Sequence, residues 1–180
     1  MRIIRGSHRG RRINPPVSLP VRPTTDLAKE SLFNILDNNI YFEDTRVLDL
    51  YAGTGSISYE FASRGAPLVI AVDINPRCVR YISKTAEELG FSQLKAIRSS
   101  SLGYLRQNAG KFDLIFADPP YDLEGITEIP ETVFDRQMLN PDGWLIIEHP
   151  QQIDLSNFPY FYEKRKYGKV NFSFFRFVSK

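Results

Sequence analysis

Residues 46–55 read RVLDLYAGTG, and this stretch decides the fold of the chain. Its first half is a short apolar run typical of a buried strand, and its second half is a turn that contains Gly53 and Gly55. Apolar residues at helical spacing follow over residues 57–62. Glycine lets a backbone approach a ligand closely, and a helix N-terminus supplies free N–H groups. The pattern therefore predicts a strand, a ligand-binding turn and a helix.

Strands and helices alternate on both sides of this stretch. Short apolar runs predict strands at residues 46–50, 68–72, 94–98, 112–117 and 143–148. Helical spacing predicts helices at residues 27–38, 57–62, 76–89, 102–108 and 132–139. Such alternation is typical of an α/β fold, a doubly wound and mostly parallel sheet with helices on both faces.

The two ends of the chain depart from this alternation. Residues 158–167 and 169–178 flank Gly168 and predict an antiparallel hairpin. Its second arm carries phenylalanines on both faces of one strand, so we expect core residues there and not a base-stacking platform: Phe172, Phe174, Phe175 and Phe177. At the other end, residues 3–4 and 11–13 predict a small hairpin. It forms part of a basic arm, residues 1–23, ahead of one domain, residues 24–180.

Two carboxylates limit which ligand the glycine turn binds. Asp49 lies four residues before Gly53, where it would repel a pyrophosphate and attract an ammonium group. Asp73 ends a strand 18 residues beyond Gly55, which suits the two hydroxyls of a ribose. Ser58 stands where a dinucleotide-binding turn has its third glycine. These residues favour S-adenosylmethionine, which has an ammonium group, a ribose and no phosphate, over NAD.

A second motif, Asp118-Pro119-Pro120-Tyr121, directly follows the strand predicted at residues 112–117. The carboxyl ends of strands are where open α/β sheets bind ligands. The prolines fix the turn and remove two N–H donors, which leaves its carbonyls free to accept hydrogen bonds. A carboxylate, a fixed carbonyl and an aromatic ring together are suited to binding a planar NH2 group. Taken alone, the tetrapeptide equally fits a proline-rich turn with a capping aspartate.

Composition is that of an ordinary globular domain, with 180 residues of which 42% are hydrophobic and 24% charged. The longest apolar runs are strand-sized and the opening residues lack the apolar core of a signal peptide, so we expect a cytoplasmic protein without a membrane span. The single cysteine, Cys78, is expected to be a small buried helix residue. Two histidines and one cysteine leave no cluster at metal-ligand spacing.

Net charge is distributed unevenly along the chain. The first 23 residues contain six arginines and no acidic residue, and residues 160–180 contain six basic residues and one acidic residue. The segment between has 11 basic and 20 acidic residues, a net charge of −9. Two basic ends on an acidic body predict binding of a polyanion, with arginine suited to bidentate phosphate contacts. A solvated charge run is the alternative.

With both motifs in view, the chain resembles the bacterial methyltransferases that modify a guanine N2 of 16S ribosomal RNA, the RsmD type. The resemblance covers nearly the whole length and rests on residues 2–6, 9–12, 22–26, 30–34, 48–55 and 118–121. The glycine turn and the Asp-Pro-Pro-Tyr box are shared by many amino methyltransferases, whereas the arginine-rich opening followed by Arg-Pro-Thr-Thr-Asp is more specific. One departure is Ser99-Ser100-Ser101, where the family usually has an Asp or Asn that contacts the cofactor adenine.

The resemblance implies a seven-stranded sheet with one reversed strand and a set of functional residues. For catalysis it implies Asp118, Pro119, Pro120 and Tyr121. For S-adenosylmethionine it implies Asp49, Ala52, Gly53, Thr54, Gly55, Asp73, Ile74, Ser100, Ser101 and Leu102. For the RNA we expect Arg5, Arg9, Arg11, Arg12, Arg22 and Thr24. The expected partner is 16S ribosomal RNA, free or within a small ribosomal subunit or its precursor, bound by a monomer away from any membrane.

Two alternatives remain open from the sequence. The first is a methyltransferase that acts on another amine, an adenine N6 in DNA or RNA or a protein glutamine, because each presents an NH2 group to the same box. Against DNA, the chain has no room for a separate target-recognition domain; against glutamine, a basic arm would be unnecessary. The second is a non-catalytic RNA-binding module that has kept the fold, which the intact motifs disfavour.

Overall fold

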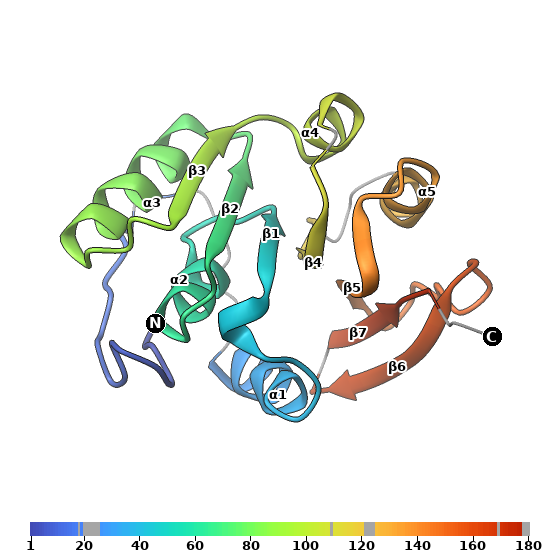
Figure 1. Ribbon diagram of the computed structural model, residues 1–180, viewed down its shortest axis with the longest axis horizontal. Helices are drawn as coiled ribbons and strands as arrows, with labels where there is room; N and C mark the ends of the chain where they lie inside the picture. The colour runs from blue at the N-terminus through green and yellow to red at the C-terminus, as the bar shows by residue number, and fades with distance from the viewer. Residues whose placement is uncertain (18, 20–25, 109, 121–124, 169, 178–180) are drawn as a thin grey trace.

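The computed structural model describes residues 1–17, 19, 26–108, 110–120, 125–168 and 170–177. Within them, seven strands form one sheet in the order β3-β2-β1-β4-β5-β7-β6 (Figure 1). The strands are β1 (Arg46–Leu50), β2 (Leu68–Asp73), β3 (Leu94–Arg98), β4 (Phe112–Ala117), β5 (Leu139–Pro150), β6 (Phe161–Tyr167) and β7 (Val170–Phe175). β1 to β5 are mutually parallel, and β7 is antiparallel to both of its neighbours. The predicted α/β class and the single reversed strand are confirmed.

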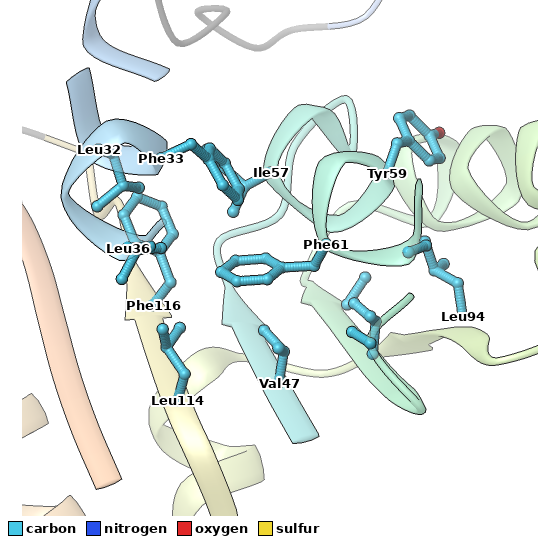
Figure 2. Packing of buried hydrophobic residues seen from close by; sticks show 14 of the residues in the cluster. Leu32, Phe33, Leu36, Val47, Ile57, Tyr59, Phe61, Leu94, Leu114 and Phe116 are labelled. Atoms are coloured by element: carbon cyan, nitrogen blue, oxygen red, sulfur yellow. The ribbon is translucent and has the colours of Figure 1, made fainter. Parts of the chain in front are cut away.

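Helices cover both faces of the sheet. They are α1 (Asp26–Leu36), α2 (Ser56–Ser63), α3 (Pro76–Glu88), α4 (Ser101–Gln107) and α5 (Glu128–Asp135), with a short 3-10 turn η1 (Phe42–Asp44). Side chains alternate along each strand, so Val47 faces α1, α2 and α3 whereas Leu48 faces α4 and α5. On the first face, residues of α1 and α2 such as Phe33 and Phe61 pack onto Val47 and Phe116 (Figure 2).

Most predicted boundaries match the structure, and the exceptions are α5 and β5, which was predicted at residues 143–148 and spans Leu139–Pro150. The strands at residues 46–50, 94–98 and 112–117 are as predicted, and β2 is one residue longer than expected. The helix predicted at residues 132–139 instead spans residues 128–135. Pro130 lies in its first turn, where proline loses no helical hydrogen bond, so the helix can begin before it. Leu139 consequently belongs to β5, where it pairs with Phe112.

The C-terminal predictions are confirmed. β6 and β7 form the expected antiparallel pair, and Phe172, Phe174 and Phe175 are fully buried in the core. Phe177 is half-buried and packs against the same core. Cys78 is a buried residue of α3, as expected.

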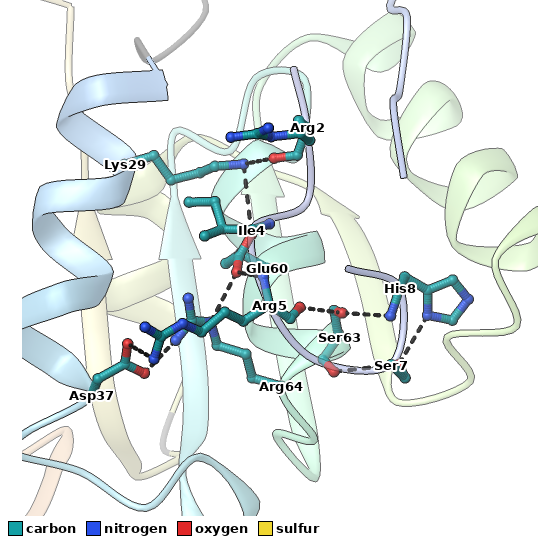
Figure 3. A network of polar contacts seen from close by, with 10 residues as sticks. All are labelled: Arg2, Ile4, Arg5, Ser7, His8, Lys29, Asp37, Glu60, Ser63 and Arg64. Carbon is teal, nitrogen blue, oxygen red and sulfur yellow. Dashed lines mark hydrogen bonds and ion pairs between the residues drawn. The ribbon is translucent and has the colours of Figure 1, made fainter. Parts of the chain in front are cut away.

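The N-terminal segment lies along α2. Its backbone makes one antiparallel bridge, between Arg2 and Arg12, so the expected pairing of residues 3–4 with 11–13 is reduced to a single bridge with flanking hydrogen bonds. The reason is that the N–H groups of Ile4 and Arg5 donate to the carboxylate of Glu60, at 2.8 and 3.0 Å (Figure 3). They are therefore not available to a partner strand.

Glu60 is the centre of a buried ionic network. Its side chain is fully buried and also accepts from Arg64 Nε at 2.9 Å, and Lys29 Nζ lies 3.7 Å away (Figure 3). Lys29 is 1% exposed and donates to the carbonyl of Arg2 at 2.6 Å. Burial lowers the pKa of Lys29, and the Glu60 charge acts in the opposite direction. A buried carboxylate with this many donors ties α1, α2 and the N-terminal segment together.

Replacing Glu60 with glutamine should destabilise the protein by about 3–5 kcal/mol, because it leaves the buried Lys29 without its counter-charge and removes one of the two carboxylates that pair with Arg64. Urea denaturation followed by circular dichroism measures the loss. Amide hydrogen exchange should also accelerate at Ile4 and Arg5, whose N–H groups bond to Glu60. Equal exchange rates in variant and wild type would contradict this role.

The matched control is Glu30→Gln. Glu30 pairs with Arg2 at 3.1 Å, and both side chains are about half exposed, at 41% and 52%. Exposed pairs contribute less than about 1 kcal/mol, so this variant should unfold close to wild type.

Candidate cofactor and amine site

Three carboxylates lie at the carboxyl ends of adjacent parallel strands and share one face of the sheet. Asp49 of β1 pairs with Ala71 of β2 and with Phe116 of β4. Asp73 lies two residues after Ala71, and Asp118 lies two residues after Phe116. Residues two apart in a strand point to the same side. All three therefore face the side that α1, α2 and α3 cover.

The two sequence motifs meet in one hollow. The glycine turn after β1 and the aspartate after β4 line it from opposite sides, together with the start of α2. Its lining residues are Asp49, Tyr51, Ala52, Gly53, Thr54, Ser56, Ile57, Phe116 and Asp118. Four predicted cofactor residues and one predicted catalytic residue are thus brought together.

The glycine turn has the backbone that its sequence requires. Gly53 and Gly55 have φ angles of 55° and 82°, in the left-handed region that glycine adopts without strain. A Cβ on Gly55 would lie 2.8 Å from the Tyr59 ring, so α2 packs directly against this glycine. Tyr51 also has a positive φ of 61°, which is uncommon for a residue with a side chain and marks a constrained turn.

Asp73 holds this turn in place. Its Oδ2 accepts the N–H of Gly53 at 2.8 Å and its Oδ1 accepts the N–H of Asn75 at 2.7 Å. A carboxylate has about four acceptor positions, so two backbone bonds leave room for ligand hydroxyls. The residue predicted to bind the ribose is therefore also the one that fixes the glycine turn.

Asp49 is a buried carboxylate with an unusual pKa. It is 1% exposed and accepts a hydrogen bond from the hydroxyl of Ser58. Burial raises the pKa of Asp49 to about 7, the Ser58 hydrogen bond opposes that rise, and the negative charge of Asp118 adds to it. Ser58 was noted in the sequence only as a missing glycine; its spacing of nine residues from Asp49 gives no signal until α2 folds back on β1.

The remaining predicted cofactor residues lie beside the hollow and do not line it. Ile74 is 68% exposed at the end of β2. Ser100 caps α4 by accepting the N–H of Gly103 at 3.1 Å, Ser101 is buried, and Leu102 is half-buried. The Ser100 hydroxyl is therefore occupied by a capping bond in this structure.

The Asp-Pro-Pro-Tyr box lies partly within the described residues. Asp118 is half-buried, Pro119 is buried and Pro120 is exposed. Tyr121 lies outside the described residues, as do Arg22 and Thr24, so their predicted roles stay predictions.

The arginines of the N-terminal segment differ in their surroundings. Arg5 is paired with Asp37 at 2.8 Å, whereas Arg9, Arg11 and Arg12 are exposed. Arg5 and Arg9, with Arg2 and the backbone between them, line an open hollow of about 700 Å³. This surface is basic and lies along α2, the helix that begins at the glycine turn.

The part of the chain that the structure describes contains no group of three His, Cys, Asp or Glu residues arranged to hold a metal ion. Each of its helices is too short or too polar to cross a lipid bilayer.

Comparison with known proteins identifies the relatives of this chain. The family model described as conserved hypothetical protein 95 matches residues 1–176. The ribosomal RNA small subunit methyltransferase D of Haemophilus influenzae is 33% identical over 152 residues, which cover 82% of this chain and 78% of the relative. The protein of the same name from Escherichia coli K12 is 32% identical, covering 82% and 71%.

A solved structure of a hypothetical protein from Thermus thermophilus has the same fold. It superimposes with a TM-score of 0.85 over 98% of this chain and 99% of that chain, at 24% identity. At this identity the likeness carries the fold, and the functional argument rests on the residues of the site.

Lowering the pH from 7.5 to 5.5 should weaken binding of S-adenosylmethionine, by about tenfold for each pH unit below 7. The reason is that Asp49, with a pKa of about 7, must be ionised to hold an ammonium group. Calorimetry in buffers of different ionisation enthalpy should detect proton release on binding at pH 6.5. Asp49→Asn should bind weakly with little dependence on pH. An affinity for the wild type that is constant over this range would contradict the role of Asp49.

Stability of the ligand-free protein should change in the opposite sense. Because the folded state raises the pKa of Asp49 above its ordinary value of 3.8, protonated Asp49 stabilises the fold at low pH. This contribution is complete below about pH 4 and is lost as the pH rises through 7. Denaturation of wild type and Asp49→Asn across this range isolates the contribution.

Proposed function

The chain belongs to the family of the ribosomal RNA small subunit methyltransferase D proteins, and we propose that it transfers a methyl group from S-adenosylmethionine to the N2 amine of a guanine in 16S ribosomal RNA. One observation carries the proposal: Asp49, the glycine turn and Asp118 line a single hollow. A cofactor bound by Asp49 and the glycine turn would present its methyl group to an amine bound by Asp118.

The chemistry of the lining residues fits S-adenosylmethionine. This cofactor supplies a methyl group on a sulfonium, which is a good leaving group. Asp49 is buried, and an ammonium group beside it would favour the ionised form of its carboxylate. The attraction between the two charges would offset the cost of burying the carboxylate. Asp73 accepts the ribose hydroxyls and Ile74 packs on the adenine, while Gly53 and Gly55 allow the turn to approach closely.

The amine-binding residues have a separate task. The lone pair of a guanine NH2 group is conjugated with the ring, so it points poorly at a methyl group. Asp118 accepts one N–H and the carbonyl of Pro119 accepts the other, which favours a tetrahedral nitrogen. Once methylated, the nitrogen is acidic and its proton passes to Asp118 or to water. Tyr121 stacks on the base, which must leave its helix to enter the hollow.

The N-terminal segment supplies the phosphate contacts. It follows α2 from the glycine turn, where Thr54 donates to the sulfur of Met1, to the far end, where the N–H of Ser7 bonds to Ser63. Arg9, Arg11 and Arg12 are exposed along this path. We propose that the RNA backbone binds here. We further propose that the protein acts as a monomer in the cytoplasm, on the ribosomal subunit or its precursor.

The alternatives make different predictions. A glutamine or DNA adenine methyltransferase would leave 16S RNA unmodified, and a non-catalytic module would bind RNA without turnover. Incubation of the protein with S-adenosylmethionine and 16S RNA, followed by nucleoside analysis, separates them. Formation of N2-methylguanosine is expected, and its absence under conditions where both ligands bind would overturn the proposal.

Asp118→Ala should lower the methyl-transfer rate by about 10²–10⁴-fold while changing cofactor affinity little, because the partner of Asp118 is the target amine. Single-turnover kinetics give the rate and calorimetry gives the affinity. Asp135→Ala, an exposed aspartate at the end of α5, is the matched control and should behave as wild type. A normal rate for Asp118→Ala would show that another group holds the amine.

Replacing Arg9, Arg11 and Arg12 together with glutamine should weaken RNA binding and lower its salt dependence. If each contacts a phosphate of single-stranded RNA, the slope of log affinity against log salt falls by roughly 0.7 per arginine. The same guanine should still be methylated, because phosphate contacts position without reading sequence. RNA affinity is measured against salt, and the methylated base is mapped.

The comparison variant removes the same number of charges from β6, at Lys164, Arg165 and Lys166. It should keep the wild-type salt slope. A lower slope in this variant, with an unchanged slope in the arginine variant, would place the RNA along β6.

A further inference from the structure

Ser56 has a buried hydroxyl without a partner. It is the first residue of α2, and it is 5% exposed. Within the part of the chain that the structure describes, its Oγ has no hydrogen-bond partner. Burying a hydroxyl without a hydrogen bond costs free energy, so the large majority of buried hydroxyls in folded proteins are paired. A ligand that binds beside Ser56 would supply the missing partner.

Ser56 belongs to the lining of the hollow, together with Asp49 and the glycine turn. The hydroxyl residues two positions before and after it are occupied. Thr54 donates to the sulfur of Met1 at 3.6 Å, and Ser58 donates to the carboxylate of Asp49. Of these three hydroxyls in the described structure, the one on Ser56 is left to bind a ligand.

The start of α2 is suited to a negatively charged group. Its N-cap residue is Gly55, which has no side chain to cap the helix. The first N–H groups of a helix have no partner within it, and they form the positive end of the helix dipole. A carboxylate only accepts hydrogen bonds, so it fits a helix N-terminus to which the Ser56 hydroxyl adds a further donor.

A negatively charged side chain lies next to these donors. The Asp49 carboxylate accepts from Ser58, two residues after Ser56, so it lies at the first turn of α2. A group that attracts an ammonium and a group that attracts a carboxylate are therefore neighbours. The methionine part of S-adenosylmethionine has its α-ammonium and its α-carboxylate on one carbon atom, and it matches this arrangement.

We propose that Ser56 is a cofactor-binding residue, whose hydroxyl donates to the α-carboxylate of S-adenosylmethionine at the N-terminus of α2. This inference rests on the proposed function, and it adds a binding residue for a part of the cofactor that carries no reacting atom. The bound carboxylate would give the buried hydroxyl its partner. The protein should consequently distinguish ligands by their carboxylate.

The test compares two ligands that differ by one carboxylate. The first is S-adenosylhomocysteine, and the second is its decarboxylated analogue, which keeps the adenosine, the thioether and the amine. Calorimetry at pH 8, above the pKa of about 7 of Asp49, gives both affinities for wild type and for Ser56→Ala. The variant loses a hydrogen bond to a charged group, so its affinity for S-adenosylhomocysteine should fall at least about tenfold. Its affinity for the analogue should stay within about twofold of wild type.

The comparison of the two ligands separates recognition from structural support. If the hydroxyl only shaped the hollow, the variant would lose affinity for both ligands by the same factor, and that result would overturn the proposal. An unchanged affinity for S-adenosylhomocysteine would overturn it as well.

Stability of the ligand-free protein gives an independent measurement. Alanine removes a buried hydroxyl that has no partner and is a good helix former, so the Tm of Ser56→Ala should equal or exceed that of wild type. A clear loss of stability would show that the hydroxyl already has a partner within the chain, against the proposal. Ser92→Ala is the matched control, because Ser92 is exposed in the turn between α3 and β3, and it should behave as wild type in both measurements.

Failure of the proposed function gives a different result. If wild type binds neither S-adenosylmethionine nor S-adenosylhomocysteine, the proposed function fails and the role of Ser56 fails with it. If wild type binds both and forms N2-methylguanosine in 16S RNA, while Ser56→Ala binds S-adenosylhomocysteine as tightly as wild type, only the role of Ser56 fails.

Discussion

The parallel register of β2, β1, β4 and β5 is the constraint on which the site depends. It places the carboxyl ends of four strands side by side, and the two-residue period of each strand turns Asp73, Asp49 and Asp118 to one face. Like charges held this close repel, and the raised pKa of Asp49 reflects that repulsion as well as burial. The ionised form of Asp49 is therefore unfavourable in the ligand-free protein. Under the proposed function, the ammonium group of the cofactor would favour that ionised form.

α2 connects this edge to the basic segment. Ser58, on its first turns, holds the Asp49 carboxylate, and Glu60, two residues later, receives the N-terminal segment. Residues two apart on a helix point to different sides, so one short helix serves both contacts. The N-terminal segment and the cofactor turn therefore belong to the same rigid unit. RNA bound along the segment would be held in a fixed position relative to the hollow, because α2 connects the two without a linker.

The sequence was sufficient to predict those elements that a single local pattern determines. The apolar runs gave the strands, and glycine at left-handed positions gave the turn after β1. Sequence reasoning was wrong about the bounds of α5, which begins four residues earlier than predicted, with Pro130 tolerated in its first turn. It also missed the roles of Ser58 and Glu60, because their partners lie on other elements and no spacing along the chain indicates them. The roles of Glu60 and Ser58 become visible only after α2 is packed against β1 and the N-terminal segment.

Charge separation in this molecule determines how an RNA can approach. The hollow is lined by carboxylates, so a phosphate cannot occupy it, whereas the exposed arginines lie along α2 outside it. Under the proposed function, the backbone must stay on the arginines while one base crosses to the acidic edge. A base within a helix cannot reach so far from its own phosphates, which requires an unpaired or flipped guanine. The electrostatics of the fold thus select the conformation of the RNA before any contact with the base is made.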